Sequence, residues 1–141
     1  MDGPIRLLGV VEEPLSLDQV VAAVSDRRAG GTAFFLGTVR DRDSGRDVVR
    51  LDYSAHPTVI DELRRVAEKI VADHPVVSLA AVHRVGELAV GDIAVIVAVA
   101  CPHRSEAFVA CRQFIDDLKH SVPIWKHQCF ADGEQEWVGV C

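Results

Sequence analysis

Ile93-Ala94-Val95-Ile96-Val97-Ala98-Val99-Ala100-Cys101 is the longest apolar run of the sequence. A membrane-spanning helix needs roughly 20 such residues, so this shorter run indicates a buried strand or another core segment. We predict a strand over residues 92–100. A second apolar segment, residues 76–85, precedes it and predicts another strand. The two are joined by residues 86–91, which begin and end with glycine.

The composition of the chain bounds its class. It has 141 residues, the size of one ordinary domain, so we expect residues 1–141 to form a single domain. With 49% hydrophobic and 26% charged residues it is not a disordered chain. Its net charge of −6 argues against a general nucleic-acid binder. The start, Met1-Asp2-Gly3-Pro4, has no secretory pattern, and the four cysteines form no CxxC pair. We therefore expect a cytoplasmic protein with reduced thiols and no membrane association.

The segments on the N-terminal side of the apolar run predict alternating strands and helices. Residues 5–11 predict a strand, and Ser16-Leu17-Asp18-Gln19 has the form of a capping box that starts a helix. Residues 32–39 predict a second strand, with a bulge or a close backbone approach at Gly37. After the charged loop 40–47, residues 48–55 are expected to be the hairpin partner of that strand.

Two further helices and a closing hairpin complete the prediction. One helix begins near Pro57 and ends at His74-Pro75. The next covers residues 105–120, and residues 124–130 and 136–140 pair around Asp132-Gly133. The order of elements predicts an α+β fold with a mainly antiparallel sheet and about three helices. On the last helix the residues expected to share one buried face are Phe108, Cys111, Phe114, Ile115 and Leu118.

The scarce lysines are the first candidates for chemistry. The chain has only Lys69, Lys119 and Lys126, beside twelve arginines. Lys119 falls in the last turn of a predicted helix, where a cation is also favoured by the helix dipole. Lys126 lies between Trp125 and His127 in an otherwise apolar entry to a hairpin, which favours acid–base or amine chemistry. An exposed strand position is the alternative for Lys126.

Basic side chains elsewhere indicate anion binding. His103-Arg104-Ser105 comes directly after a buried strand and before a helix, where free N–H groups and an arginine can hold a phosphate or carboxylate. Ser105 as a simple helix cap is the alternative. Arg40 ends a predicted strand at the mouth of the charged loop, where it can be either a surface charge or part of the site.

Zinc binding is a further alternative. Cys101-Pro102-His103 and His127-Gln128-Cys129 together supply two cysteines and two histidines, a set that tetrahedral zinc accepts. The one-residue spacing within each pair is not the usual two to four. We therefore assign no metal ligands. Cys111, on the apolar face of a predicted helix, is expected to be a core residue and not a nucleophile.

Taken together, these segments resemble the large, catalytic subunit of molybdopterin synthase. The resemblance extends over about residues 5–138, and its strength lies in the order and spacing of several motifs. The most specific is Phe114-Ile115-Asp116-Asp117-Leu118-Lys119, followed by Val122-Pro123-Ile124-Trp125-Lys126. The other segments are Gly37-Thr38-Val39-Arg40, His83-Arg84-Val85-Gly86-Glu87-Leu88, Gly91-Asp92 and His103-Arg104-Ser105.

The resemblance implies a fold of the α/β hammerhead type and a sulfurtransferase activity. In this family a small ubiquitin-like partner subunit brings a C-terminal Gly-Gly thiocarboxylate into a pocket of the large subunit. Its sulfur is transferred to cyclic pyranopterin monophosphate, and two transfers build the dithiolene of molybdopterin. The family is typically a heterotetramer with a central homodimer of large subunits. The resemblance implies no resident cofactor.

The resemblance also implies roles for particular residues. Lys119 and Lys126 are the expected catalytic pair, and either could neutralise developing charge, move protons or attack a carbonyl carbon. Arg40, His103 and Arg104 are expected to hold the substrate anion, the latter two coming from the dimer mate in a composite pocket. The full set of expected substrate-binding residues is Thr38, Val39, Arg40, His103, Arg104, Lys119, Lys126, His127 and Gln128.

Three departures from the family pattern qualify these expectations. Gln128 stands where a Glu is expected after the second lysine, and His56 replaces the more usual Tyr. The sequence stops at Cys141, where family members often have a longer polar tail, so we expect any substrate contact of that tail to be missing or replaced. A non-catalytic module that binds anions and docks a ubiquitin-like tail is the main alternative function, and a small zinc protein is the other.

Overall fold

The computed structural model describes residues 3–43 and 45–138, and its first sheet is built around the long apolar run. This run forms β7 (Ile93–Cys101), which pairs antiparallel with β5 (Ser78–Arg84) on one side and β2 (Gly31–Thr38) on the other. β1 (Ile5–Val11) joins β5 in parallel, so the strand order is β1-β5-β7-β2. The strands expected from the two apolar segments are confirmed.

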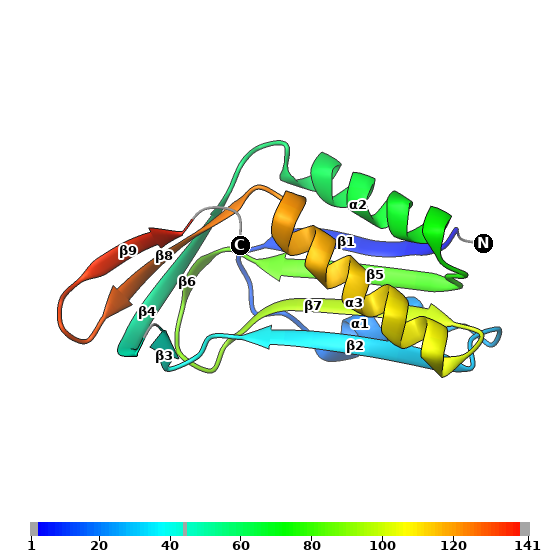
Figure 1. The fold of residues 1–141 in the computed structure, drawn as a ribbon, viewed down its shortest axis with the longest axis horizontal. Coiled ribbons are helices and arrows are strands. Elements are labelled where there is room, and N and C mark those ends of the chain that lie inside the picture. The colour runs from blue at the N-terminus through cyan, green and yellow to red at the C-terminus, as the bar shows by residue number, and fades with distance from the viewer. Residues whose placement is uncertain (1–2, 44, 139–141) are drawn as a thin grey trace.

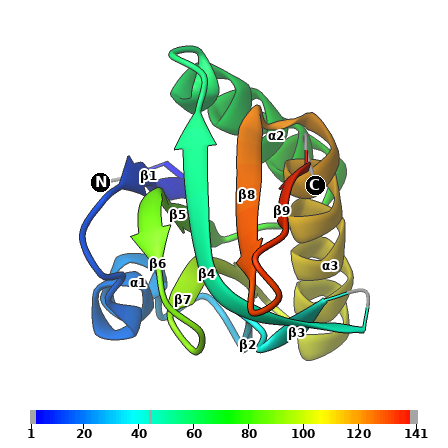
Figure 2. The same ribbon diagram turned by 90° about the vertical axis from the view of Figure 1, so that its left-hand side faces the viewer.

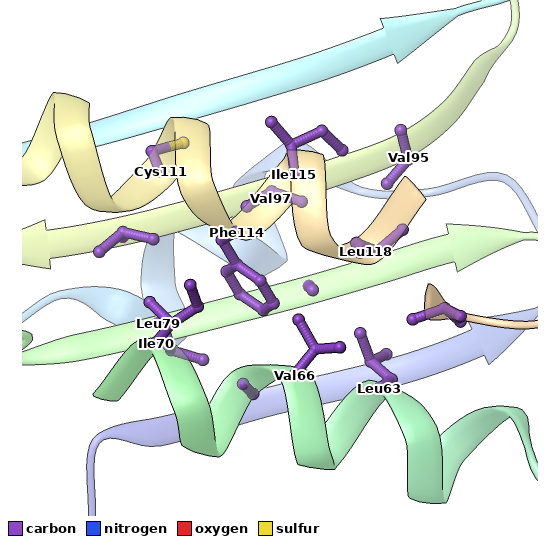
Figure 3. Packing of buried hydrophobic residues seen from close by; sticks show 14 of the residues in the cluster. Leu63, Val66, Ile70, Leu79, Val95, Val97, Cys111, Phe114, Ile115 and Leu118 are labelled. Carbon is purple, nitrogen blue, oxygen red and sulfur yellow. The ribbon is translucent and has the colours of Figure 1, made fainter. Parts of the chain in front are cut away.

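Helices cover both faces of this sheet (Figure 1). α1 (Leu17–Val24) packs on one face, while α2 (Val59–Asp73) and α3 (Arg104–Ser121) cover the other. In Figure 3 the ring of Phe114 points from α3 toward Ile70 of α2 and Leu79 of β5. All three side chains are fully buried, so this layer is the centre of the core.

A second sheet stands across one end of the first (Figure 2). Its long strand β4 (Arg46–Ala55) pairs antiparallel with β8 (Ile124–Phe130) and with the short β6 (Gly86–Leu88). The two-residue β3 (Arg42–Asp43) pairs with the start of β4, and β9 (Gln135–Val138) pairs with β8. The closing hairpin is thus confirmed as far as Val138, and residues 139–140 lie outside the described residues.

The expected hairpin between residues 32–39 and 48–55 is wrong. β2 is an edge strand of the first sheet and pairs with β7, whereas β4 belongs to the second sheet. The charged loop does not reverse the chain onto β2. It contains the β3–β4 hairpin and carries the chain across to the second sheet, where β4 pairs with residues of β8 that lie 69 to 82 positions later in the chain. Pairing over such a distance leaves no local sequence signal.

Local details bear out most of the sequence reasoning and correct part of it. The Ser16 hydroxyl accepts from the Gln19 N–H at 3.1 Å, as the capping box predicts. The register of β2 against β7 shifts after Gly37, so the bulge is confirmed. Phe108 is 65% exposed, so its expected place on the buried face of α3 is wrong. α3 begins after His103, which makes no side-chain cap, so Ser105 is inside the helix.

One hydrophobic cluster joins both sheets. Leu51 of β4 and Ile124 of β8 belong to the same buried cluster as Leu79, Phe114 and Val97. The molecule is therefore one α+β domain with three helices among the described residues and mostly antiparallel pairing, as expected. In the part of the chain that the structure describes, no helix combines the length and the apolar character needed to cross a membrane.

Candidate functional site

A pocket lies where the end of β2 meets the inner face of the second sheet. It encloses about 310 Å³, including the space open to solvent. The structure brings five of the nine expected substrate-binding residues together here. The residues that line the pocket are Thr38, Val39, Arg40, Arg42, Asp43, Leu51, Tyr53, Lys126 and Gln128.

The alternation of β8 explains why Lys126 faces this pocket. Ile124, Gln128 and Phe130 are buried, and residues at every second position of a strand share a face. Lys126 lies on this inner face between Ile124 and Gln128. Pro123 turns the chain from α3 into β8, and its carbonyl accepts from the His56 N–H at 3.1 Å.

The turn before β7 fixes the other wall of the pocket. Val39 donates its N–H to the Asp92 carbonyl at 3.0 Å, and its own carbonyl accepts from the Gly91 N–H at 2.8 Å. Gly91 has a φ of +91°, which favours glycine. The Asp92 carboxylate in turn accepts from the Ala89 N–H at 2.9 Å and from Arg84 at 3.3 Å. These hydrogen bonds fix the backbone at Val39, directly before Arg40.

Lys119 lines a second, smaller pocket of about 170 Å³ beside the first. His83, at the end of β5, lines this pocket too and is 3% exposed. The ring of His83 contacts the ring of Tyr53 edge-on, with 4.9 Å between centroids. Because Tyr53 lines the Lys126 pocket, the Tyr53–His83 pair connects the surroundings of the two lysines.

His83 is held as a neutral ring. Its Nδ1 lies 2.7 Å from the Arg84 carbonyl oxygen, which can only accept, so this nitrogen carries the hydrogen. Burial lowers the pKa of His83 to about 4; the hydrogen bond to Arg84 opposes this shift, and the charge of Lys119 adds to it. His83 is part of a motif that carries the family resemblance, but it was not predicted as a site residue. No local sequence pattern indicates that it lies close to Lys119.

His103 and Arg104 lie at the opposite end of α3 from Lys119. They line an open depression with Gly30, Pro102 and Ser105. At 1.5 Å per residue, the helix separates Arg104 from Lys119 by about 22 Å. Within one chain, these two expected anion-binding residues are therefore not part of the lysine pockets.

His127 lies on the outer face of β8, away from Lys126. Its ring stacks on Trp137 of β9 with 4.4 Å between centroids. Its two nitrogens face Asp52 at 3.9 Å and the side-chain oxygen of Gln135 at 3.0 Å. On the same face, Arg50 donates to the Cys129 sulfur at 3.6 Å. His127 could therefore meet a substrate only from outside the pocket.

The four residues considered for zinc are not assembled into one site. Cys101 ends β7 and His103 precedes α3, whereas His127 and Cys129 lie on the outer face of the second sheet. Over residues 3–43 and 45–138, no group of three or more His, Cys, Asp or Glu side chains is placed to hold a metal ion. The zinc alternative has no geometric support in this part of the chain.

The side chain of Gln128 is hydrogen-bonded to two carboxylates. Its side-chain nitrogen donates to Asp43 at 2.6 Å and to Glu136 at 3.1 Å. Asp43 also accepts from Arg40 at 3.5 Å. Sequence reasoning missed both carboxylates. Asp43 comes against β8 only in the folded sheet, and Glu136 was not identified although the closing hairpin that pairs it with Gln128 was predicted.

Comparisons with known proteins agree with this architecture. The MoaE protein family model matches residues 10–121. The chain is 45% identical to molybdopterin synthase catalytic subunit 1 of Mycobacterium tuberculosis, over 98% of this chain and 94% of that protein. It is 43% identical to the molybdopterin synthase catalytic subunit of a Nostoc species, over 90% and 78%. The crystal structure of molybdopterin synthase from Staphylococcus aureus superposes with a TM-score of 0.86 at 33% identity, covering 92% of this chain and 95% of that one. The resemblance drawn from the motifs is confirmed, and the chain belongs to the MoaE family of molybdopterin synthase catalytic subunits.

Proposed function

We propose that this chain is the catalytic subunit of a molybdopterin synthase. It transfers sulfur from the C-terminal thiocarboxylate of a small ubiquitin-like partner to cyclic pyranopterin monophosphate. The observation that carries this proposal is the placement of Lys119 and Lys126 in neighbouring pockets linked by Tyr53 and His83. Arg40 stands at the mouth of the Lys126 pocket, so a chain of net charge −6 gathers cations at one place.

The reaction needs these cations because both reactants are anionic. Each transfer breaks the carbon–sulfur bond of the partner's tail and forms a carbon–sulfur bond on the pterin. A water oxygen takes the place of the sulfur, so the tail leaves as a carboxylate. Negative charge develops on oxygen and sulfur during these steps, and fixed ammonium groups in a partly dry pocket stabilise it.

The pocket residues divide between binding and chemistry. Arg40 binds the substrate phosphate, because a guanidinium offers several donors to an anion. Thr38 and Val39 form the wall beside it. Lys119 and Lys126 act on the reacting atoms by neutralising charge and moving protons. His83 stays neutral beside Lys119 and adds no competing positive charge.

A second copy of the chain completes the substrate site in this proposal. His103 and Arg104 lie too far along α3 to reach the lysines of their own chain, so they serve the pocket of the partner copy. The edge strand β2 and the adjacent surface of α3 offer an apolar contact face for that copy. Its exposed apolar residues are Phe34, Phe35, Leu36, Phe108 and Val109. The assembly is then a homodimer of this chain with one small subunit bound to each copy.

We assign the cytoplasm as the place of this reaction. Cys101, Cys111 and Cys129 are free thiols, as expected in a reducing compartment. Burial raises the pKa of the Cys111 thiol to about 11, so this thiol is an unreactive core residue.

Reconstitution tests the proposed activity. The chain is mixed with a thiocarboxylated small subunit and cyclic pyranopterin monophosphate, and the dithiolene product is measured. The proposal predicts product formation that requires all three components. Binding of the small subunit without any product would instead identify a non-catalytic docking module.

Mixed dimers test the shared site. Arg104→Ala and Lys126→Ala are each expected to inactivate the homodimer. After subunit exchange, a mixed dimer has one pocket with both residues intact, so an equal mixture should recover about a quarter of the parental activity. A mixture that exchanges subunits but stays inactive would show that each site is formed within one chain.

A further inference from the structure

Gln128 is a buried polar side chain whose donors are fully used. It is 2% exposed, and a primary amide nitrogen carries two hydrogens. One is donated to Asp43 on β3 at 2.6 Å and the other to Glu136 on β9 at 3.1 Å. Hydrogen bonds to charged acceptors are the stronger kind, so the amide of Gln128 ties three strands together.

The Asp43 end of this contact belongs to the segment that bears Arg40. Asp43 accepts from Arg40 at 3.5 Å, and the Asp41 carbonyl accepts from the Val48 N–H at 2.8 Å. The side chain of Arg42 is also turned back onto this segment, since it donates to Asp47 at 3.0 Å. Arg40 itself is well exposed. Its direction over the pocket therefore depends on how the segment is attached to the second sheet.

We propose that Gln128 is a positioning residue that fixes the Arg40 segment relative to Lys126. Gln128 and Lys126 are two residues apart on the inner face of β8, so attaching Asp43 to Gln128 sets the spacing between the two cations. The consequence for substrate binding rests on the proposed synthase function, whereas the attachment of the Arg40 segment to Gln128 is independent of that function.

The choice of an amide at this position has a physical reason. A carboxylate at position 128 would be an acceptor facing two other acceptors, Asp43 and Glu136, with no hydrogen of its own to donate to either. Arg40 also donates to Asp43, at 3.5 Å, but the shorter hydrogen bond to Asp43, at 2.6 Å, and the hydrogen bond to Glu136, at 3.1 Å, come from Gln128. Gln128→Glu, which introduces the residue expected from the family pattern, therefore removes both hydrogen bonds.

The first readout is independent of any activity. In hydrogen-exchange mass spectrometry, Gln128→Glu is expected to speed exchange at the amides of residues 40–43 and 45–48. Gln19→Glu is the matched control, because it makes the same charge change at an exposed position of α1, where glutamate also suits a capping box. Parental exchange rates in Gln128→Glu would overturn the proposal.

The second readout is kinetic. Gln128→Glu is expected to raise KM for cyclic pyranopterin monophosphate by about tenfold or more, with a much smaller change in kcat. Adding Asp43→Asn to this variant restores a donor and an acceptor, so exchange and KM should both move back toward the parent. Failure of this second substitution to restore either quantity would contradict the positioning role.

Two further outcomes keep the test decisive. If Gln128→Glu does not fold, Asp43→Ala breaks the same contact from its more exposed side and should give the same faster exchange and higher KM. Unchanged values in that variant would overturn the proposal. If the parent makes no molybdopterin at all, the synthase function fails, while the exchange measurement still decides whether Gln128 holds the segment.

Discussion

β7 and β8 are inner strands of the two sheets, and they bury different kinds of side chain. In β7 every residue from Ala94 to Cys101 is buried and apolar. In β8 the inner face carries Lys126 and Gln128 between Ile124 and Phe130, and the outer face carries His127. The first sheet therefore supplies most of the hydrophobic stabilisation. The second sheet supplies Lys126 and Gln128, whereas Lys119 comes from α3 and Arg40 from the segment that follows β2.

This comparison predicts that the lysines matter for turnover and not for folding. Lys126→Ala and Lys119→Ala should each lower synthase turnover by about 10²–10³-fold, since each removes a cation aimed at developing charge. Their free energies of unfolding should stay within about 1 kcal/mol of the parent. Steady-state assays and urea unfolding measure the two quantities. Lys69→Ala is the matched control, because Lys69 is exposed on α2, where it pairs with Asp73 of the same helix at 3.1 Å.

Substitutions in the hydrophobic core that packs against the first sheet should instead lower the stability of the fold. Ile70→Ala on α2 is expected to lower the free energy of unfolding by about 2–5 kcal/mol, because Ile70 is fully buried. Ile60→Ala changes the same residue type on the same helix, where the side chain is 37% exposed, and should cost far less. Equal losses in the two variants would contradict the proposed core.

His83 lies at the junction of the two regions and should make stability depend on pH. The pKa of His83 is about 4 in the folded protein, against about 6.5 for an unperturbed histidine. Between these values the unfolded chain binds the extra proton. The free energy of unfolding therefore falls as the pH decreases from 6.5 to 4, by on the order of 3 kcal/mol from this group.

His83→Asn isolates this contribution. Asparagine can keep a donor near the Arg84 carbonyl but does not titrate. The stability advantage of the parent over the variant, measured by urea unfolding at several pH values, should shrink as the pH falls through this range. An advantage that stays constant would show that His83 is not held neutral by burial.

The smallest expected effect concerns the bulge that leads from the first sheet into the pocket. A Cβ on Gly37 would lie 2.7 Å from a methyl carbon of Val95 and 3.2 Å from the ring of Phe35. Gly37→Ala should therefore cost about 1–3 kcal/mol of unfolding free energy. Gly9→Ala is the control in another strand, because its Cβ would make an ordinary contact of 3.6 Å with Val82. A Gly37→Ala variant as stable as the control would contradict this packing.

The success of sequence reasoning followed the range of the interactions. β7, the capping box at Ser16 and the closing hairpin depend on neighbouring residues, and all three were predicted. The pairing of β4 with β8 depends on residues far apart in the chain, and a local hairpin was predicted in its place. Phe108 and Phe114 follow the same helical spacing, yet only the second meets α2. Periodicity marks a face, while burial depends on what covers that face.

The same difference between local and long-range contacts applies to the candidate site. The motifs around Lys119 and Lys126 are close in sequence, and the helix–turn–strand geometry brings both to one side of the molecule. Neither His83 beside Lys119 nor Asp43 against Gln128 could be predicted, because each contact joins elements far apart in the chain. Arg104 was expected to reach the pocket from the dimer mate, and within one chain α3 places it at the opposite end of the helix from Lys119.

The fate of the partner's thiocarboxylate tests the central claim most directly. In a single-turnover mixture of this chain, cyclic pyranopterin monophosphate and thiocarboxylated small subunit, intact-protein mass spectrometry follows the C-terminus of the small subunit. The account predicts conversion to a carboxylate only when chain and substrate are both present, with two tails consumed for each dithiolene formed and slow conversion with Lys126→Ala. A thiocarboxylate that persists beside the parental chain, or that is consumed equally fast with Lys126→Ala, would contradict it.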